Sequence, residues 1–303
     1  MAGTTERETT SREREIGNEL RRLRVRADLT AAELSKRVGF SASKISRLES
    51  GARGVTEVDA TLFAANCKAT RTEVLRLVRL INEVDDGHRL RTNDEQMALM
   101  INSETTASEI ICYEPQVIPG LLQTEGYARA LFHWLGKFVG ETGEEAVRNR
   151  LNRQKLLRRA DPPRLNAYIH EDVLRAQVAE PEVMHDQVLH LLFVSSEPHC
   201  ALRVIPADRC PAGVFGPAFR LLLYRNHKPV IYTENQFTSL YLESPDELSG
   251  YRFVLDRVRE VTLDTNGSRE LLATVASHHE DIRSQRFTAA IEPAQRWQHS
   301  LQD

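Results

Sequence analysis

Hydroxyl and basic side chains that can bind a phosphate backbone gather close to the N-terminus. Ser41, Ser43, Lys44 and Arg47 lie within one short segment. Their hydroxyl, ammonium and guanidinium groups can donate hydrogen bonds to phosphate oxygens and to base edges. The first 80 residues carry 16 Lys and Arg against 11 Asp and Glu, whereas the rest of the chain carries 24 against 32. The local basic surplus and these side chains together indicate DNA binding.

Motifs of the common catalytic sites are absent from the sequence. It contains no GxSxG, P-loop, GxGxxG or HExxH motif, and the His278-His279 pair has no third ligand at a suitable spacing. The four cysteines form no CxxC pair, and His199, Cys200 and Cys210 match no usual zinc spacing. We therefore expect reduced thiols, no metal, no cofactor and no enzymatic activity.

Helices must position the basic and hydroxyl groups near the N-terminus. A first helix is predicted from Glu15 onward, because Ile16, Leu20 and Leu23 recur on one face. Four arginines surround that apolar face. The chain before residue 14 is polar and is predicted to be a flexible tail.

Two short helices follow the first. Thr30 and Glu33 have the spacing of a capping box, so a second helix begins there and ends at Gly39. A third helix begins at Ser41 and ends before Gly51. The short connection between the two helices predicts a helix-turn-helix.

Apolar spacing lets the second and third helices share one core. The four positions are Leu34, Val38, Ile45 and Leu48. The polar face of the third helix then remains free to enter a major groove. We expect Ala42, Ser43 and Arg47 to lie nearest the bases.

A helical bundle that only packs would show the same apolar spacing, and this alternative remains open. The surrounding basic residues fit either a solvated face or phosphate contacts. They are Arg21, Arg22, Arg26, Lys36 and Arg37.

The ordered match of caps, turn and basic positions resembles the Xre and Cro family of repressor domains. The matching stretches are Leu29-Thr-Ala-Ala-Glu-Leu-Ser-Lys-Arg-Val-Gly39 and Ser41-Ala-Ser-Lys-Ile-Ser-Arg-Leu-Glu-Ser-Gly51. The resemblance implies an all-α, five-helix, lambda-repressor-like domain over residues 14–82. Its fourth and fifth helices would lie near residues 57–66 and 71–80. It also implies a sequence-specific transcription regulator that binds double-stranded DNA.

The same resemblance implies roles for particular residues. It places DNA contacts at Thr30, Ala31, Ser41, Ala42, Ser43, Lys44, Arg47 and Arg53. It implies a structural ion pair between Arg24 and Glu49. The family usually has a phosphate-contacting Gln at the position of Ala31, so this chain departs from the family there.

The larger C-terminal region has a different pattern. Residues 83–110 are predicted to be a linker helix, residues 111–286 an α+β domain on a mixed sheet, and residues 287–303 a tail. Strands are expected over 164–170, 201–206, 218–224, 230–234 and 237–242. Helices are expected over 121–135, 144–159, 171–177, 182–194, 245–261 and 268–286.

Part of this region resembles the C-terminal domain of actinobacterial WhiJ-type regulators, described as antitoxin-like. The matching stretches are residues 113–130, Arg153-Gln154, Val204-Ile205-Pro206 and Phe215-Gly216-Pro217. The resemblance covers residues 100–285. It implies control by a small BldB-like partner protein.

Two other functions remain open: a repressor that senses a small ligand through the C-terminal domain, and an enzyme tethered to DNA. A homodimer is expected, because one helix-turn-helix covers a single half-site. The predicted dimer contacts lie on the helical stretches 121–159 and 245–286. No apolar run is long enough to span a membrane, and a cytoplasmic location is expected.

Overall fold

The computed structural model describes residues 8–83, 87–135, 143–235 and 238–299, with the side chains at 89, 91–98 and 287–299 left out. Residue contacts divide the chain into two compact units. Unit 1 comprises Met1–Ala107 and Leu222–Ser249, and unit 2 comprises Ser108–Leu221 and Gly250–Asp303. The division does not follow chain order, since a late segment belongs with the N-terminal helices.

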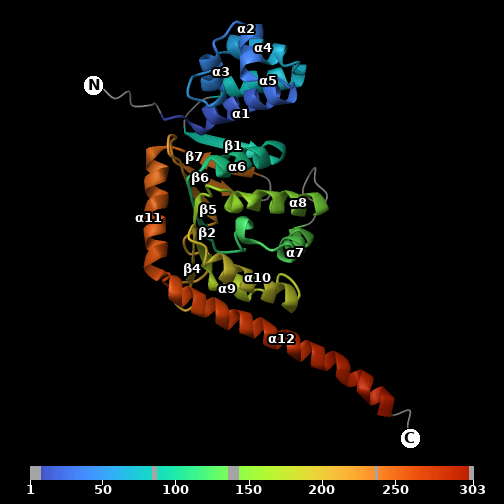
Figure 1. Ribbon diagram of the computed structural model, residues 1–303. Coiled ribbons are helices and arrows are strands. Elements are labelled where there is room, and N and C mark those ends of the chain that lie inside the picture. The colour runs from blue at the N-terminus through green and yellow to red at the C-terminus, as the bar shows by residue number, and fades with distance from the viewer. Residues whose placement is uncertain (1–7, 84–86, 136–142, 236–237, 300–303) are drawn as a thin grey trace. The chain divides into compact units, whose positions relative to one another are not determined.

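Five helices form the N-terminal part of unit 1 (Figure 1). They are α1 (Ser11–Arg26), α2 (Ala31–Val38), α3 (Ala42–Glu49), α4 (Glu57–Asn66) and α5 (Arg71–Asn82). Each follows a Thr or Ser N-cap whose hydroxyl accepts a hydrogen bond from the backbone N–H three residues later. Leu20, Leu34, Ile45 and Leu77 are among the fully buried residues of the core that these helices enclose.

A helix and three strands also lie wholly within unit 1. They are β1 (His88–Thr92), α6 (Asn93–Thr106), β6 (Val230–Glu234) and β7 (Thr238–Leu242). Both β1 and β6 pair antiparallel with β7, so that His88 and Ile231 lie on opposite sides of Leu242.

Unit 2 is built around three parallel strands, β2 (Glu109–Glu114), β3 (Arg164–His170) and β4 (Cys200–Ile205). The connection from β2 to β3 contains η1 (Gly120–Leu122), α7 (Glu125–Leu135), α8 (Gly143–Gln154) and η2 (Lys155–Arg158). The connection from β3 to β4 contains α9 (Glu171–Arg175) and α10 (Pro181–Val194). The chain ends with α11 (Pro245–Val261) and α12 (Thr265–His299), and α12 packs along α10 and against β4.

The described strands form one mixed sheet. Their order is β1-β7-β6-β5-β2-β3-β4, where β5 (Phe219–Leu223) spans the sequence boundary between the units. Pairing is antiparallel along β1-β7-β6 and parallel along β2-β3-β4. This confirms the expected fold class, an N-terminal all-α helix-turn-helix domain and a C-terminal α+β domain with a mixed sheet.

Three segments differ from the expectations. The predicted linker helix, 83–110, contains β1 before α6, because β1 hydrogen-bonds to a strand about 150 residues later. Residues 11–13 of the predicted flexible tail, 1–13, belong to α1 instead, since Thr10 and Glu13 form a capping box that begins this helix at Ser11, and residues 1–7 lie outside the described residues. The predicted C-terminal tail, 287–303, is helical as far as His299.

Candidate nucleic-acid interface

The turn between α2 and α3 is fixed by caps on both sides. The Thr30 hydroxyl accepts a hydrogen bond from the Glu33 N–H at 3.2 Å, and the Glu33 carboxylate accepts one from the Thr30 N–H at 2.7 Å. Gly39 ends α2 in the left-handed conformation, with φ of 72°, which favours glycine. The Ser41 hydroxyl then accepts the Lys44 N–H at 3.1 Å and begins α3. These local bonds set the direction of α3.

Gly17 allows α1 to cross α3 closely. A Cβ atom on Gly17 would lie 2.6 Å from the Glu49 carbonyl oxygen and 2.8 Å from that of Leu48. Ile45 and Leu48, on the inner face of α3, are fully buried. The inner face of α3 is therefore held by backbone contact and by packing, while its outer face remains free.

Arg24 and Glu49 join α1 to the end of α3. The Arg24 Nε and Nη2 atoms donate to the two Glu49 carboxylate oxygens at 2.6 and 2.8 Å, and Nη1 donates to the Leu29 carbonyl at 2.7 Å. Their side chains are only 14% and 10% exposed. The hydrogen bonds to Glu49 raise the pKa of Arg24, so the guanidinium remains charged. The structure thus brings together the two residues that the resemblance paired.

The residues predicted to bind DNA are mostly exposed. Those on the surface are Thr30, Ser41, Ala42, Ser43, Arg47 and Arg53. Ala31 is half-buried and packs against the helical core. The Arg47 Nε donates to the Ser43 carbonyl at 3.4 Å, which directs the side chain back toward the start of α3.

Lys44 is engaged within the domain. Its Nζ lies 2.6 Å from an Asp59 carboxylate oxygen and 3.5 Å from the centroid of the Phe40 ring. The side chain is 20% exposed. One of the three ammonium donors of Lys44 is thus used by Asp59, so fewer donors are available for a phosphate.

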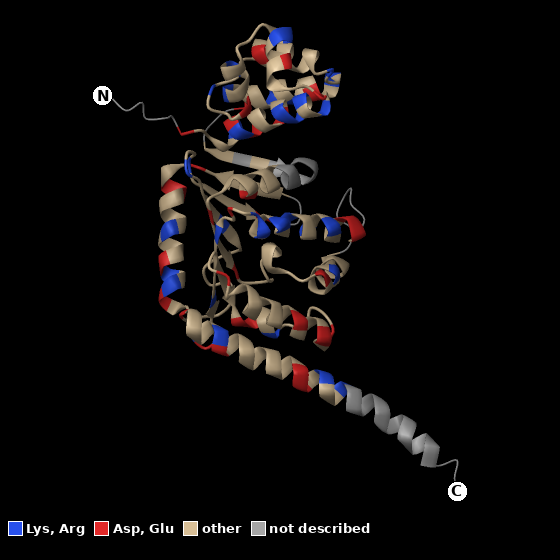
Figure 2. Cartoon of the chain, in the orientation of Figure 1, with Lys and Arg blue, Asp and Glu red and all other residues tan. Residues whose placement is uncertain are grey.

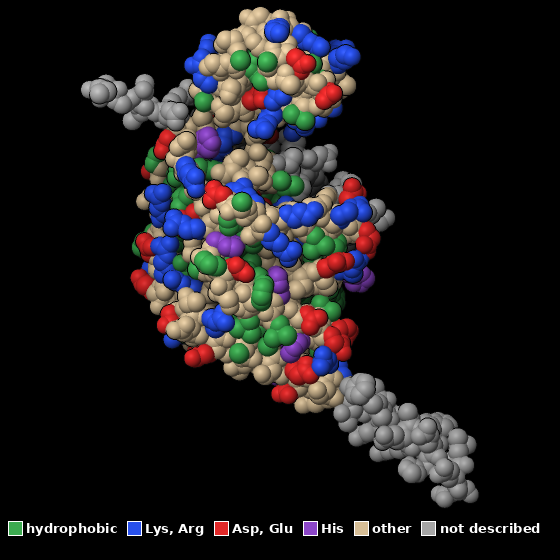
Figure 3. Space-filling model, in the orientation of Figure 1, with side chains coloured by type: hydrophobic (Ala, Val, Ile, Leu, Met, Phe, Trp, Pro, Cys, Tyr) green, Lys and Arg blue, Asp and Glu red, His purple; other side chains and the backbone are tan. Residues whose placement is uncertain are grey.

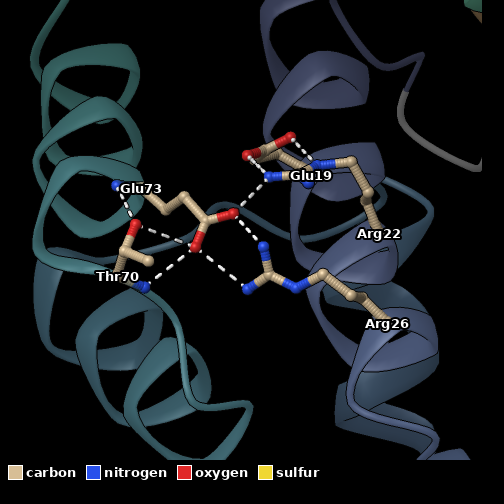
Figure 4. Close-up of polar contacts among 5 residues, drawn as sticks. All are labelled: Glu19, Arg22, Arg26, Thr70 and Glu73. Carbon is tan, nitrogen blue, oxygen red and sulfur yellow. Dashed lines mark hydrogen bonds and ion pairs between the residues drawn. The ribbon is translucent and has the colours of Figure 1, made fainter.

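Two of the basic residues on α1 are used for packing against α5 (Figure 4). Arg22 Nη2 lies 2.9 Å from a Glu73 carboxylate oxygen, and Arg26 donates to both oxygens of the same carboxylate. Arg22 also pairs with Glu19 at 2.7 Å. The hydrogen bond from Arg26, the largest cause, lowers the pKa of Glu73 well below its usual range. Sequence reasoning missed this ion cluster, although Thr70 and Glu73 have the spacing of a capping box.

The remaining basic residues of this part lie at the surface. Arg21, Lys36 and Arg37 are exposed. The five basic residues that fitted either a solvated face or phosphate contacts therefore divide into two groups. Arg22 and Arg26 bind carboxylates within the domain, whereas the other three are exposed and can contact phosphates.

A second unpredicted cluster ties α1 to the strands of unit 1. The Arg14 guanidinium lies 3.8 Å from the Glu243 carboxylate, with both side chains only 4% exposed, and 4.3 Å from the centroid of the Tyr224 ring. The Ser11 N–H donates to the same carboxylate at 2.6 Å. Burial raises the pKa of Tyr224 to about 12, so its hydroxyl stays protonated. No local signal predicts a contact between residues so far apart in sequence.

Two glutamine side chains bind the backbone of residues 120–124, within the longest stretch that resembles the WhiJ-type regulators. Gln154 Nε2 donates to the carbonyls of Gly120 and Gln123 at 3.1 and 2.7 Å. Gln187 accepts from the Thr124 N–H at 2.7 Å and donates to the Leu122 carbonyl at 2.9 Å. Gln154, which belongs to a matching stretch, and Gln187, which does not, therefore fix a buried turn of unit 2.

The other candidate groups form no further site in the described part of the chain. All four cysteines are buried and free. Within the described ranges, no cluster of three or more His, Cys, Asp or Glu residues could hold a metal ion. None of the described helices has both the length and the apolar character of a membrane span.

Two protein-family models match the chain. A helix-turn-helix domain matches residues 15–77, which include most of α1, all of α2 to α4 and the first seven residues of α5. A domain of unknown function (DUF5753) matches residues 97–274, more than half of the chain. The comparison with curated proteins gave no match. The first match agrees with the geometry of α2 and α3 and identifies this part as a DNA-binding domain.

Proposed function

The chain belongs to the DUF5753 family, and we propose that it is a transcription regulator of the WhiJ kind that recognises double-stranded DNA through α3. The observation that carries the proposal is the outer face of α3. Ser43 and Arg47 are exposed there, while Ile45 and Leu48 bury the opposite face. The helix-turn-helix match supports the same proposal independently.

In this proposal α3 lies in the major groove with its exposed face, which includes Ser43 and Arg47, toward the bases. Arg47 has the planar donor group that suits bidentate hydrogen bonding to a guanine edge. Lys36, Arg37 and Arg53 provide exposed positive charges for phosphates on either side. The N-terminus of α3, capped by Ser41, adds its backbone N–H groups for an anion.

We further propose that two copies bind one operator and that a small BldB-like protein controls them through residues 111–286, as in an antitoxin-like system. The dimer follows from one helix-turn-helix covering one half-site. The partner rests on the WhiJ resemblance. Such a regulator would work in the cytoplasm, by binding rather than by catalysis.

Selection of sequences from a random duplex DNA pool by the full chain tests the proposal. The expected result is an enriched sequence with two similar half-sites about one helical turn, roughly 34–36 Å, apart. A pool that stays random after repeated rounds would overturn it. Proteins that co-purify with the full chain then test the partner: a small protein bound to residues 111–286 is expected.

A further inference from the structure

A strongly basic segment lies in unit 2, away from the helix-turn-helix in sequence. Residues 146–160, which include most of α8 and all of η2, contain six Lys and Arg and no Asp or Glu. Two of the six face inward: Arg153 is buried, and Arg150 donates to the Gln123 side chain at 2.9 Å. Fold stabilisation therefore explains only part of this charge.

The exposed members lie along one side of the segment. Arg148, Asn152 and Lys155 follow the i, i+4, i+7 spacing of a single helical face. Lys155 and Arg158 are three residues apart in the 3-10 turn η2, where side chains at that spacing eclipse each other. Arg148, Lys155 and Arg158 thus form a line that we name the α8 basic stripe. Figure 2 shows Lys and Arg along α8 with acidic residues only at its N-terminal end, and Figure 3 shows basic side chains over this region.

The stripe differs from most basic residues of unit 2 in lacking carboxylate partners. Seven arginines elsewhere in this unit pair with an Asp or Glu, whereas the exposed Arg209 and Arg252 are separate single positions. The seven are Arg129, Arg164, Arg175, Arg257, Arg259, Arg283 and Arg286. Within the described part of the chain, the side chains of the three stripe residues form no hydrogen bond or ion pair. The helix dipole favours basic residues in the last turn but does not account for Arg148 in the middle of α8.

Neighbouring titratable groups do not neutralise the stripe. His190 lies close enough to Arg158 that burial and the arginine charge both lower its pKa, so the imidazole is neutral near pH 7. Glu144, at the start of α8, is occupied by Arg129 from α7. The stripe is therefore a line of uncompensated positive charge on a chain whose net charge is −3.

We propose that the α8 basic stripe binds the phosphate backbone of DNA, as a second contact besides α3. The line of stripe residues contains no aromatic or apolar side chain, and Asn152 is a further donor. Arginine is common at protein interfaces too, but the cores of those interfaces are enriched in aromatic side chains, which the stripe lacks, and depleted of Lys, which the stripe contains. From Arg148 to Arg158 it extends about 16 Å, given the rises of α and 3-10 helices. One DNA strand carries about four to five charges over that length.

This inference rests on the proposed function, because that function makes DNA the polyanion at hand. The proposal for α3 and the proposal for the α8 basic stripe can nevertheless be contradicted independently of each other. Recognition by α3 is tested by sequence selection. The stripe is tested by the salt dependence of binding to a duplex of arbitrary sequence.

The test compares the full chain with R148Q/K155Q/R158Q on an arbitrary duplex over a series of KCl concentrations. Each phosphate contact contributes about 0.9 to the slope of log K against log salt. The triple variant should therefore lower the magnitude of that slope by about two to three and weaken binding at least tenfold at low salt. The charge-preserving variant R148K/R158K should keep the slope of the unmodified chain.

A matched control, R209Q/K228Q/R252Q, removes three other exposed cations whose side chains have no carboxylate partner among the described residues. This control should change the slope by less than half as much as the stripe variant. Equal slopes for the stripe variant and the unmodified chain would overturn the proposal, as would equal losses in the stripe and control variants. An acidic protein that binds the unmodified chain but not the stripe variant, with no change of salt slope on DNA, would assign the stripe to a protein partner instead.

Discussion

Glu73 illustrates how single side chains decide which basic residues remain available to DNA. Its carboxylate accepts hydrogen bonds from Arg22 and Arg26 on α1 and from the Thr70 cap of its own helix. Two of the arginines that sequence analysis left open are therefore committed to stability. The same applies to Lys44 and Asp59, whose contact joins two helices through side chains 15 residues apart.

The Glu73 cluster predicts a pH dependence of stability. The pKa of Glu73 is lowered in the folded protein, first by the Arg26 hydrogen bond. Its contribution is therefore fully present above the unfolded carboxyl pKa, about 4.3, and is lost as the pH falls through the folded value. Glu73→Gln should lower the Tm at pH 7 and reduce the Tm difference between pH 7 and pH 3.

Thermal unfolding at a series of pH values measures both effects. Glu57→Gln is the control, because Glu57 accepts a hydrogen bond only from the neutral Asn82 amide among the contacts seen in the described chain. If Tm depends on pH in the same way for the Glu73 variant and the unmodified chain, the ion cluster around Glu73 does not stabilise the protein.

Among the elements, the crossing of α1 and α3 positions the recognition surface. Gly17→Ala should push the Glu49 carbonyl away, because the new Cβ would lie 2.6 Å from that oxygen. Overpacking of this kind costs about 1–3 kcal/mol. The variant should unfold at lower urea concentration and bind DNA more weakly.

Gly250→Ala provides the opposite case on α11. A Cβ there would meet nothing within 4 Å, so the gain in helix propensity should stabilise the chain by about 0.5–1 kcal/mol. If both alanine variants shift the urea midpoint in the same direction, the close crossing of α1 and α3 is not the reason that position 17 needs a glycine.

The helices and strands also show which parts of the fold could be predicted from the sequence alone. Helices α1 to α5 were predictable because caps such as Thr30 with Glu33 and apolar spacing act within a few residues. Strand β1 was missed since its hydrogen bonds go to β7, far along the chain. The same reason hid Arg14, whose partner Glu243 is 229 positions away. The outward face of α3 was predictable, whereas the inward turn of Lys44 was not.

Over the whole molecule, Arg14 and Glu243 join the helix-turn-helix to the strands of unit 1. Glu243→Ala should destabilise the chain by about 3–5 kcal/mol, because it leaves the Arg14 charge buried without its carboxylate. Glu247→Ala breaks an exposed pair with His88 and should cost less than about 1 kcal/mol. Urea unfolding of both variants makes the comparison; similar small losses would show that the buried pair does not secure α1.

Assembly is the second property of the whole chain. Two half-sites require two copies, and the proposed dimer should form before DNA binds. Analytical ultracentrifugation of the full chain over a concentration series should approach twice the monomer mass of 34.4 kDa. A mass that stays at the monomer value throughout would leave DNA alone to bring two copies together.

The central claim is that the chain reads a DNA sequence through α3, and Arg47 tests it most directly. On the sequence selected by the full chain, Arg47→Ala should weaken binding by about 1–3 kcal/mol at fixed salt, the range for one good base contact. On an arbitrary duplex the same variant should lose much less, and Arg252→Ala should leave both affinities unchanged. Equal binding of the selected sequence by the Arg47 variant and the unmodified chain, within error, would contradict the account.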